Sequence, residues 1–192
     1  MQRTYPLIEV YYSGTRWTLI PGGADSGSYF GGPHSEYVGA AVPVEDAAIH
    51  HVATLKLPEF GIGNPQFGFS LCLLYGLCHE SCTIEYRKTA TAAVEITELD
   101  PPSITEGYPY EFYSPILPYF TLGIDGTNSY EFEELKDHLY NTGWEVRQDC
   151  LYAVVSQHPA IGYCLFDAAG ETEIVFEYDP KVGRVRATNQ CT

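Results

Sequence analysis

Residues 69–99, FSLCLLYGLCHESCTIEYRKTATAAVEITEL, decide the fold class that we predict for this chain. The stretch contains three runs, at 69–78, 82–88 and 91–99, that are rich in apolar, β-branched and aromatic residues and are joined by short polar connections. Such runs are typical of consecutive antiparallel strands. We therefore expect a β-meander here and a sheet as the framework of the fold.

Cys78 and Cys82 in this stretch raise the question of a metal site. A structural zinc ion usually takes four ligands, often from two pairs of closely spaced cysteines. Cys78 and Cys82 have the spacing of one such pair, but the cysteines further along the chain form no second pair; they are Cys150, Cys164 and Cys191. We predict no metal and no other cofactor.

The same two cysteines form a candidate redox pair. If residues 79–81 make a three-residue hairpin loop, Cys78 and Cys82 lie opposite each other on antiparallel strands, about 4.5–5.5 Å apart at Cα. This separation is within the range of a disulfide. The alternative is that both are buried thiols in a reducing compartment, and the sequence leaves this choice open.

A helix is predicted at about 129–141. Asn128 can cap its first turn, Glu131 stands three residues later as a capping box requires, and Gly143 is placed to end the helix. The apolar residues of the segment recur at helical spacing, which predicts one buried stripe. That stripe consists of Phe132, Leu135 and Leu139.

Residues 44–55 fit two patterns. Apolar residues recur at helical spacing after Pro43, but the second half of the segment also alternates as a strand would. Of the two, we predict a helix at about 44–55.

The rest of the chain reads mainly as strands, with runs at 6–12, 15–20, 171–178 and 184–188. No regular alternation of strands and helices is visible, and no linker divides the chain. We therefore predict one α+β domain, residues 1–192, with a largely antiparallel sheet.

Residues 21–39 carry many glycines and no periodicity, which predicts a long loop. The loop is no phosphate cradle, because no lysine lies between Met1 and Lys56. We find no Gly-x-Ser-x-Gly and no His-Glu-x-x-His motif, so we assign no catalytic residue. One functional hypothesis is nevertheless a small enzyme or ligand-binding protein, with a pocket under this loop and a Cys/His pair.

The chain is strongly acidic, with 25 acidic and 10 basic residues and a formal charge of −15. No lysine or arginine lies between Lys88 and Lys136. Proteins that bind DNA or RNA gain most of their affinity by neutralising phosphates with basic side chains. The charge therefore argues against nucleic acids and anionic membranes as partners, and it favours a basic protein.

The proline-rich and tyrosine-rich segment around residues 106–120 is the predicted contact region for such a partner, because tyrosine is enriched in binding hot spots. Together with the acids of the predicted helix, the candidate partner-binding residues are Glu106, Tyr108, Tyr110, Glu111, Tyr113, Glu131, Glu133 and Glu134.

These features favour a non-catalytic binding protein, such as an immunity protein or inhibitor that neutralises a basic toxin. A second alternative to this function is a subunit of a larger assembly, and the sequence leaves the oligomeric state open. The start of the chain does not read as a signal peptide, and no run is apolar enough to span a bilayer, so we expect a cytoplasmic protein.

Overall fold

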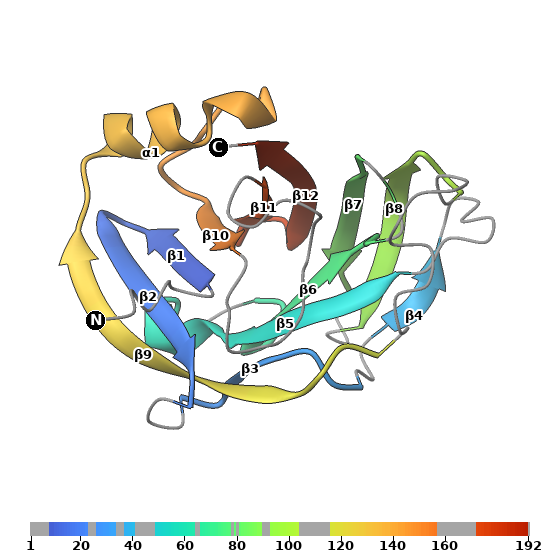
Figure 1. Cartoon of the computed structure of the whole chain (residues 1–192), viewed down its shortest axis with the longest axis horizontal. Coiled ribbons are helices and arrows are strands. Elements are labelled where there is room, and N and C mark those ends of the chain that lie inside the picture. The colour runs from blue at the N-terminus through green and yellow to red at the C-terminus, as the bar shows by residue number, and fades with distance from the viewer. Residues whose placement is uncertain are drawn as a thin grey trace.

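A computed structural model describes residues 8–22, 26–33, 37–40, 49–63, 66–77, 79, 81–89, 93–103, 116–156 and 172–191. All strands formed by these residues belong to one twelve-stranded sheet that curls into a nearly closed barrel (Figure 1). The strands are β1 (Ile8–Tyr12), β2 (Thr15–Pro21), β3 (Ser28–Phe30), β4 (Tyr37–Ala40), β5 (His50–Lys56), β6 (Ser70–Tyr75), β7 (Thr83–Lys88), β8 (Val94–Asp100), β9 (Phe120–Ser129), β10 (Leu151–Val155), β11 (Thr172–Asp179) and β12 (Arg184–Cys191). The helical elements are α1 (Phe132–His138) and the 3₁₀ turns η1 (Leu57–Phe60) and η2 (Tyr140–Thr142).

The strands follow the order β4-β8-β7-β12-β11-β10-β1-β2-β9-β3-β5-β6 across the sheet. Each described pair of neighbours is antiparallel except β4 and β8, which are parallel. The hairpins β1–β2, β7–β8 and β11–β12 join strands that follow each other in the chain. The pairs β5–β6 and β10–β11 also join consecutive strands, across longer connections. The remaining pairings bring together distant segments, so the barrel forms only when most of the chain is in place.

Side chains from β7 seal the free edge of β6, where the barrel comes near to closing. The Tyr86 hydroxyl accepts a hydrogen bond from the Leu74 amide at 2.9 Å and donates one to the Cys72 carbonyl at 2.8 Å. Lys88 is buried, and its ammonium group donates to the Ser70 carbonyl. Because buried backbone groups need partners, these two side chains replace the neighbouring strand that β6 lacks on this side.

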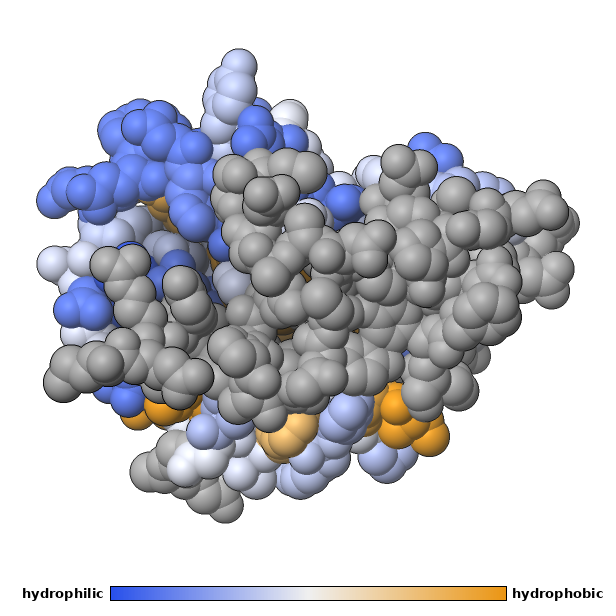
Figure 2. Space-filling model, in the orientation of Figure 1, coloured by the Kyte–Doolittle hydropathy of each residue, from blue (hydrophilic) through white to orange (hydrophobic). Residues whose placement is uncertain are grey.

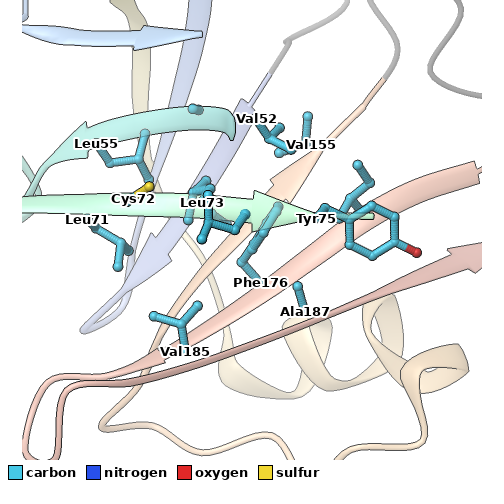
Figure 3. Close-up of a cluster of buried hydrophobic side chains, with 14 of the residues drawn as sticks. Val52, Leu55, Leu71, Cys72, Leu73, Tyr75, Val155, Phe176, Val185 and Ala187 are labelled. Atoms are coloured by element: carbon cyan, nitrogen blue, oxygen red, sulfur yellow. The ribbon is translucent and has the colours of Figure 1, made fainter. Parts of the chain in front are cut away.

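The main apolar core fills the inside of the barrel. Figure 3 shows side chains of β5 and β6 meeting those of β10, β11 and β12, among them Leu73, Phe176 and Ala187. On β11, Ile174, Phe176 and Tyr178 all belong to this core. Their spacing of two residues is the periodicity that places alternate side chains on the same face of a strand.

A second, smaller apolar cluster lies on the opposite face of the same strands, under α1. It contains Tyr11, Leu135, Leu139, Cys150, Tyr152, Val154 and Val175. The helix therefore covers the outside of the sheet at β1, β10 and β11 (Figure 1).

The fold class that we predicted is wrong in its balance of helix and strand. The described residues form a largely antiparallel β barrel with one seven-residue α-helix, and not an α+β domain. The predicted helix at 129–141 exists, but it is shorter, because β9 continues through Ser129 in register with Thr15. The last predicted turns belong to η2.

The helix predicted at 44–55 is also incorrect where the structure describes it, since His50–Lys56 is β5. Six of the seven residues of this strand are buried, because β5 lies between two strands and has covered faces on both sides. A strand buried on both faces loses strict polar alternation, which made the pattern ambiguous. Residues 41–48 lie outside the described part of the chain.

The glycine-rich segment 21–39, predicted as a loop, contributes β3 and β4 to the sheet. Gly31 and Gly32 are buried and have positive φ. A Cβ atom on Gly31 would stand 2.1 Å from the Pro118 carbonyl oxygen, so only glycine allows this close approach of two backbones. The described part of this segment therefore contributes strands to the sheet and is not one long loop.

Candidate interaction surface

Exposed acidic side chains are frequent in residues 125–145, the segment that contains the end of β9, α1 and η2. They are Asp125, Glu131, Glu133, Glu134, Asp137 and Glu145. Residues 116–145 contain only one lysine and no arginine. Figure 2 shows hydrophilic residues concentrated over the region where Figure 1 places α1. We call this group the acidic helix surface.

The helix begins where its acidic residues can cap it. Glu131 is the N-cap residue, and its backbone amide donates to Oε2 of Glu134 at 3.3 Å. The capping box that we predicted at Asn128 and Glu131 is therefore shifted by three residues, since Asn128 is still paired with Arg16 in the sheet. Acids in the first turn also interact favourably with the helix dipole.

Two basic side chains lie close to this surface, Lys136 on α1 and Arg16 on β2, which lowers the pKa of His138. Lys136 lies 2.8 Å from Oε1 of Glu133 and 5.0 Å from the centroid of the Phe132 ring. Beyond the helix, Tyr140 is 81% exposed. Acids beside an exposed aromatic ring are groups that can bind lysine or arginine side chains, by ion pairing and by cation–π contact.

Contacts to three strands attach α1 to the barrel. Leu135 and Leu139 are buried in the smaller apolar cluster on the outer face of the sheet. The Tyr130 ring meets the Tyr11 ring edge-on, with 5.3 Å between the ring centroids. A helix of seven residues is not stable by itself in water, so these tertiary contacts hold it. The orientation of the acidic helix surface depends on them.

The C-terminal end of α1 is held by a polar cluster. Nε2 of His138 lies 3.2 Å from Oε2 of Glu173 on β11. The Glu173 side chain also accepts hydrogen bonds from Gln190 at 3.0 Å and from Ser156 at 3.1 Å. The hydrogen bond with Glu173 raises the pKa of His138 above its ordinary value. Burial raises the pKa of Glu173, but the bonds from His138 and Gln190 outweigh it, so that this pKa is lowered overall.

A second polar cluster is centred on Glu177, which is 1% exposed. Its carboxylate accepts two hydrogen bonds from Arg186 at 2.9 Å and one from Tyr152 at 2.7 Å. The Arg186 guanidinium stacks on Trp144 at 4.3 Å. Because a buried carboxylate is costly unless charged donors satisfy it, this arrangement is a structural connection between β10, β11 and β12.

Cys150 lies beside this cluster, next to Arg147. One guanidinium nitrogen of Arg147 lies 2.6 Å from Sγ of Cys150 and 2.6 Å from Oδ2 of Asp179. Burial nevertheless raises the pKa of Cys150 to about 12, because it outweighs the nearby positive charge. The reactive form of cysteine is the thiolate, so this thiol is a poor nucleophile at neutral pH.

His79 and Cys82 are brought together at one end of the barrel. A Cβ atom on Gly76 would stand 2.9 Å from Nε2 of His79 and 3.2 Å from Sγ of Cys82. Both residues are buried, and burial raises the pKa of Cys82 to about 12 and lowers that of His79. The reactive form of cysteine is the thiolate, so the Cys82 thiol, which is protonated at neutral pH, is a poor nucleophile by itself.

The structure does not test the predicted redox pair of Cys78 and Cys82. Cys82 is a free thiol, and Cys78 lies outside the described residues. The hairpin assumed for the pair is absent from the pairings of the described strands, since β6 pairs with β5 while β7 pairs with β8 and β12. The redox pair stays a prediction.

The predicted partner-binding residues divide into two groups. Glu131, Glu133 and Glu134 lie together, exposed, on the acidic helix surface. The others lie outside the described residues; they are Glu106, Tyr108, Tyr110, Glu111 and Tyr113.

Sequence reasoning missed three of the six acids of the acidic helix surface, Asp125, Asp137 and Glu145, and also the exposed Tyr140. The acids have a detectable signal, because Asp137 follows Glu133 and Glu134 at helical spacing. No sequence pattern predicts the exposure of Tyr140.

Within the described part of the chain, no group of three or more histidine, cysteine, aspartate or glutamate side chains is arranged to hold a metal ion. The one α-helix found there is far too short to cross a bilayer, and no longer apolar helix is found among those residues. Comparisons with protein-family models, with curated proteins and with solved structures give no significant match to this chain.

Proposed function

We propose that this chain is a non-catalytic binding protein whose acidic helix surface engages a basic protein. The observation that carries this proposal is the exposure of six acids in residues 125–145, which contain a single lysine, no arginine and the exposed Tyr140. Opposite charges steer two proteins together and favour one orientation of docking. An immunity protein or inhibitor that neutralises a basic toxin would be one instance.

The expected partner contact combines charge with an aromatic anchor. Tyrosine and arginine are enriched among the residues that dominate binding energy. Tyr140 can receive a lysine or arginine of the partner on its ring, while Asp137 and Glu133 lie within the same short segment. The fixed position of α1 on the sheet reduces the entropy lost on binding.

The experiment starts by capturing partners on the purified full chain from a lysate of its native host at low salt. Captured proteins are identified by mass spectrometry, and each basic one is then purified for a binding measurement with this chain. The proposal requires a stoichiometric complex whose association rate falls by at least about tenfold between low salt and 0.5 M salt.

Matched variants locate the contact. Glu133→Gln combined with Asp137→Asn removes two charges from α1 without touching the capping pair Glu131 and Glu134. Glu98→Gln combined with Asp100→Asn removes the same charge from β8, which lies on the other side of the barrel (Figure 1). We expect slower association for the first pair only. Equal effects of both pairs, or none of either, would refute the assignment of the contact to α1.

The cytoplasmic location also stays a proposal. It is supported by the three described cysteines that are free thiols, Cys72, Cys82 and Cys150, since thiols persist in a reducing compartment.

A further inference from the structure

The C-terminal end of α1 is attached to the barrel through one residue with a titratable side chain. His138 is the last residue of the helix, and its Nε2 lies 3.2 Å from Oε2 of Glu173. The backbone carbonyl of His138 also accepts a hydrogen bond from Gln190 at 3.2 Å. Gln190 also donates a hydrogen bond to Glu173. The two polar contacts of His138, through its side chain and its carbonyl, therefore both lead to the Glu173 carboxylate.

Glu173 has little access to water and cannot easily replace a lost partner. Its side chain is 14% exposed, while the His138 side chain is 34% exposed. When His138 loses its proton, one tautomer of the imidazole can keep the hydrogen bond, but the attraction between opposite charges disappears. A positive charge at this end of the helix also interacts favourably with the helix dipole.

From this geometry we infer that the contact between His138 and Glu173 is a pH-dependent latch, which fixes α1 on the sheet when His138 is charged and loosens it when His138 is neutral. The direction follows from the pKa of His138, which the hydrogen bond with Glu173 raises. A raised pKa means that the stabilisation is complete below about pH 6.5 and is lost as the pH rises through the pKa of the folded state.

Other titratable groups around His138 leave this direction unchanged. On β1, Glu9 raises the pKa of His138, and on β2, Arg16 lowers it by a smaller effect. The Tyr11 ring, also on β1, lies 6.3 Å from the His138 ring, and burial raises its pKa, so it stays neutral throughout the range. On β12 the facing residue is Gln190, which does not titrate. On α1 itself, Glu134 stands one turn before His138.

The first test needs no variant. The ring protons of His138 are followed by NMR between pH 5 and 9, and the midpoint is expected above 6.5. Glu173→Gln keeps the shape of the partner but removes its charge, so it should lower the midpoint. A midpoint at or below 6.5 in the unchanged protein would overturn the latch.

The second test measures hydrogen exchange of the α1 amides over the same pH range, as protection factors corrected for the intrinsic exchange rates. The protection factors of residues 132–138 are expected to fall by about two- to fivefold as the pH rises. A change of this size corresponds to the usual stabilisation by a partly exposed ion pair at a helix end. Strand β10 serves as the internal control and should not change. Constant protection of α1 across the range would refute the inference.

Two variants separate charge from shape. His138→Gln carries no charge at any pH and should show low, constant protection, while His138→Arg is always charged and should show high, constant protection. If both variants keep the pH step of the unchanged protein, another group causes that step and the latch is wrong.

The consequence for binding rests on the proposed function. A basic partner should bind faster at pH 6 than at pH 8.5, because the acidic helix surface is then held in place. If the hydrogen-exchange protection of α1 changes with pH but no basic partner binds at either pH, the proposed function fails and the latch stands. If a partner binds equally at both pH values and the protection step is absent, the latch fails and the function stands.

Discussion

The two faces of β10 and β11 consist of alternate residues of the same strands, yet they are stabilised by different interactions. The residues of the inner face that belong to the main core are apolar or aromatic, such as Ala153 and Phe176. The outer face mixes apolar residues with charges, since Val154 and Val175 lie beside the ion-paired Glu177. The inner face therefore stabilises the barrel by burial, whereas the outer face attaches other elements at defined positions by charged hydrogen bonds.

The largest effect is expected for a cavity on the inner face. Phe176 is 0% exposed, and Phe176→Ala should lower the free energy of unfolding by about 3–5 kcal/mol. Denaturation in urea measures this change. Val175→Ala on the outer face removes a smaller volume and should cost less; a larger loss for Val175→Ala would contradict the ranking of the two faces.

Neutralising the buried carboxylate of the outer face should cost somewhat less. Glu177→Gln removes the charged acceptor for Arg186 and Tyr152, with an expected loss of about 2–3 kcal/mol in unfolding free energy. The loss is limited because the Arg186 side chain is 23% exposed and can regain water. Glu95→Gln, which breaks a pair with the exposed Arg87, is the control and should stay within about 0.5 kcal/mol. Equal losses for the two variants would show that the burial of Glu177 has no energetic consequence.

A polar site on the inner face sharpens the comparison. Tyr86→Phe leaves the Leu74 amide and the Cys72 carbonyl at the edge of β6 without their partner, which should cost about 1–3 kcal/mol. Faster hydrogen exchange of the Leu74 amide is the direct measurement. Tyr140→Phe, at an exposed position, should change neither property. An unchanged Leu74 exchange rate in Tyr86→Phe would mean that β6 finds another partner for its edge.

The smallest effect concerns pH dependence, which differs between His138 on the outer face and His79 at one end of the barrel. Burial lowers the pKa of His79, so the unfolded chain takes up a proton near pH 6.5 that the folded state does not accept. Stability from this site is thus complete above pH 6.5 and falls below it, opposite in sign to His138. When the pH is lowered from 7.5 to 5, the unchanged protein should lose more unfolding free energy than His79→Gln, which has no titrating side chain at this position. Parallel curves would disprove the burial effect at His79.

Local patterns predicted several elements correctly. The strands predicted at 6–12 and 15–20 are β1 and β2, and the turn between them uses positive φ at Ser13 and Gly14. The runs at 171–178 and 184–188 are β11 and β12, joined by a turn that ends at the positive-φ residue Gly183. These elements are predictable because the paired strands and the turn that joins them are adjacent in the sequence.

Predictions failed where distant partners decide the conformation. His50–Lys56 is a strand because β3 and β6 lie on either side of it, and β6 pairs with β5 instead of with β7. The candidate surface shows the same division. Glu133 and Glu134 are predictable from their position at the start of a helix, but the contact of His138 depends on Glu173, which is 35 positions further along the chain.

The sequence by itself determined the charge, the alternating strands, the short acidic helix and the absence of recognised catalytic motifs. Those properties depend on residue type and on spacing within a few positions. Only the tertiary structure decided that the strands curl into a nearly closed barrel, that Tyr86 and Lys88 seal the edge of β6, and that α1 is held on the outer face at Glu173. The physical reason is that buried backbone groups and charges must find partners, and the chain supplies those partners from segments that local patterns do not connect.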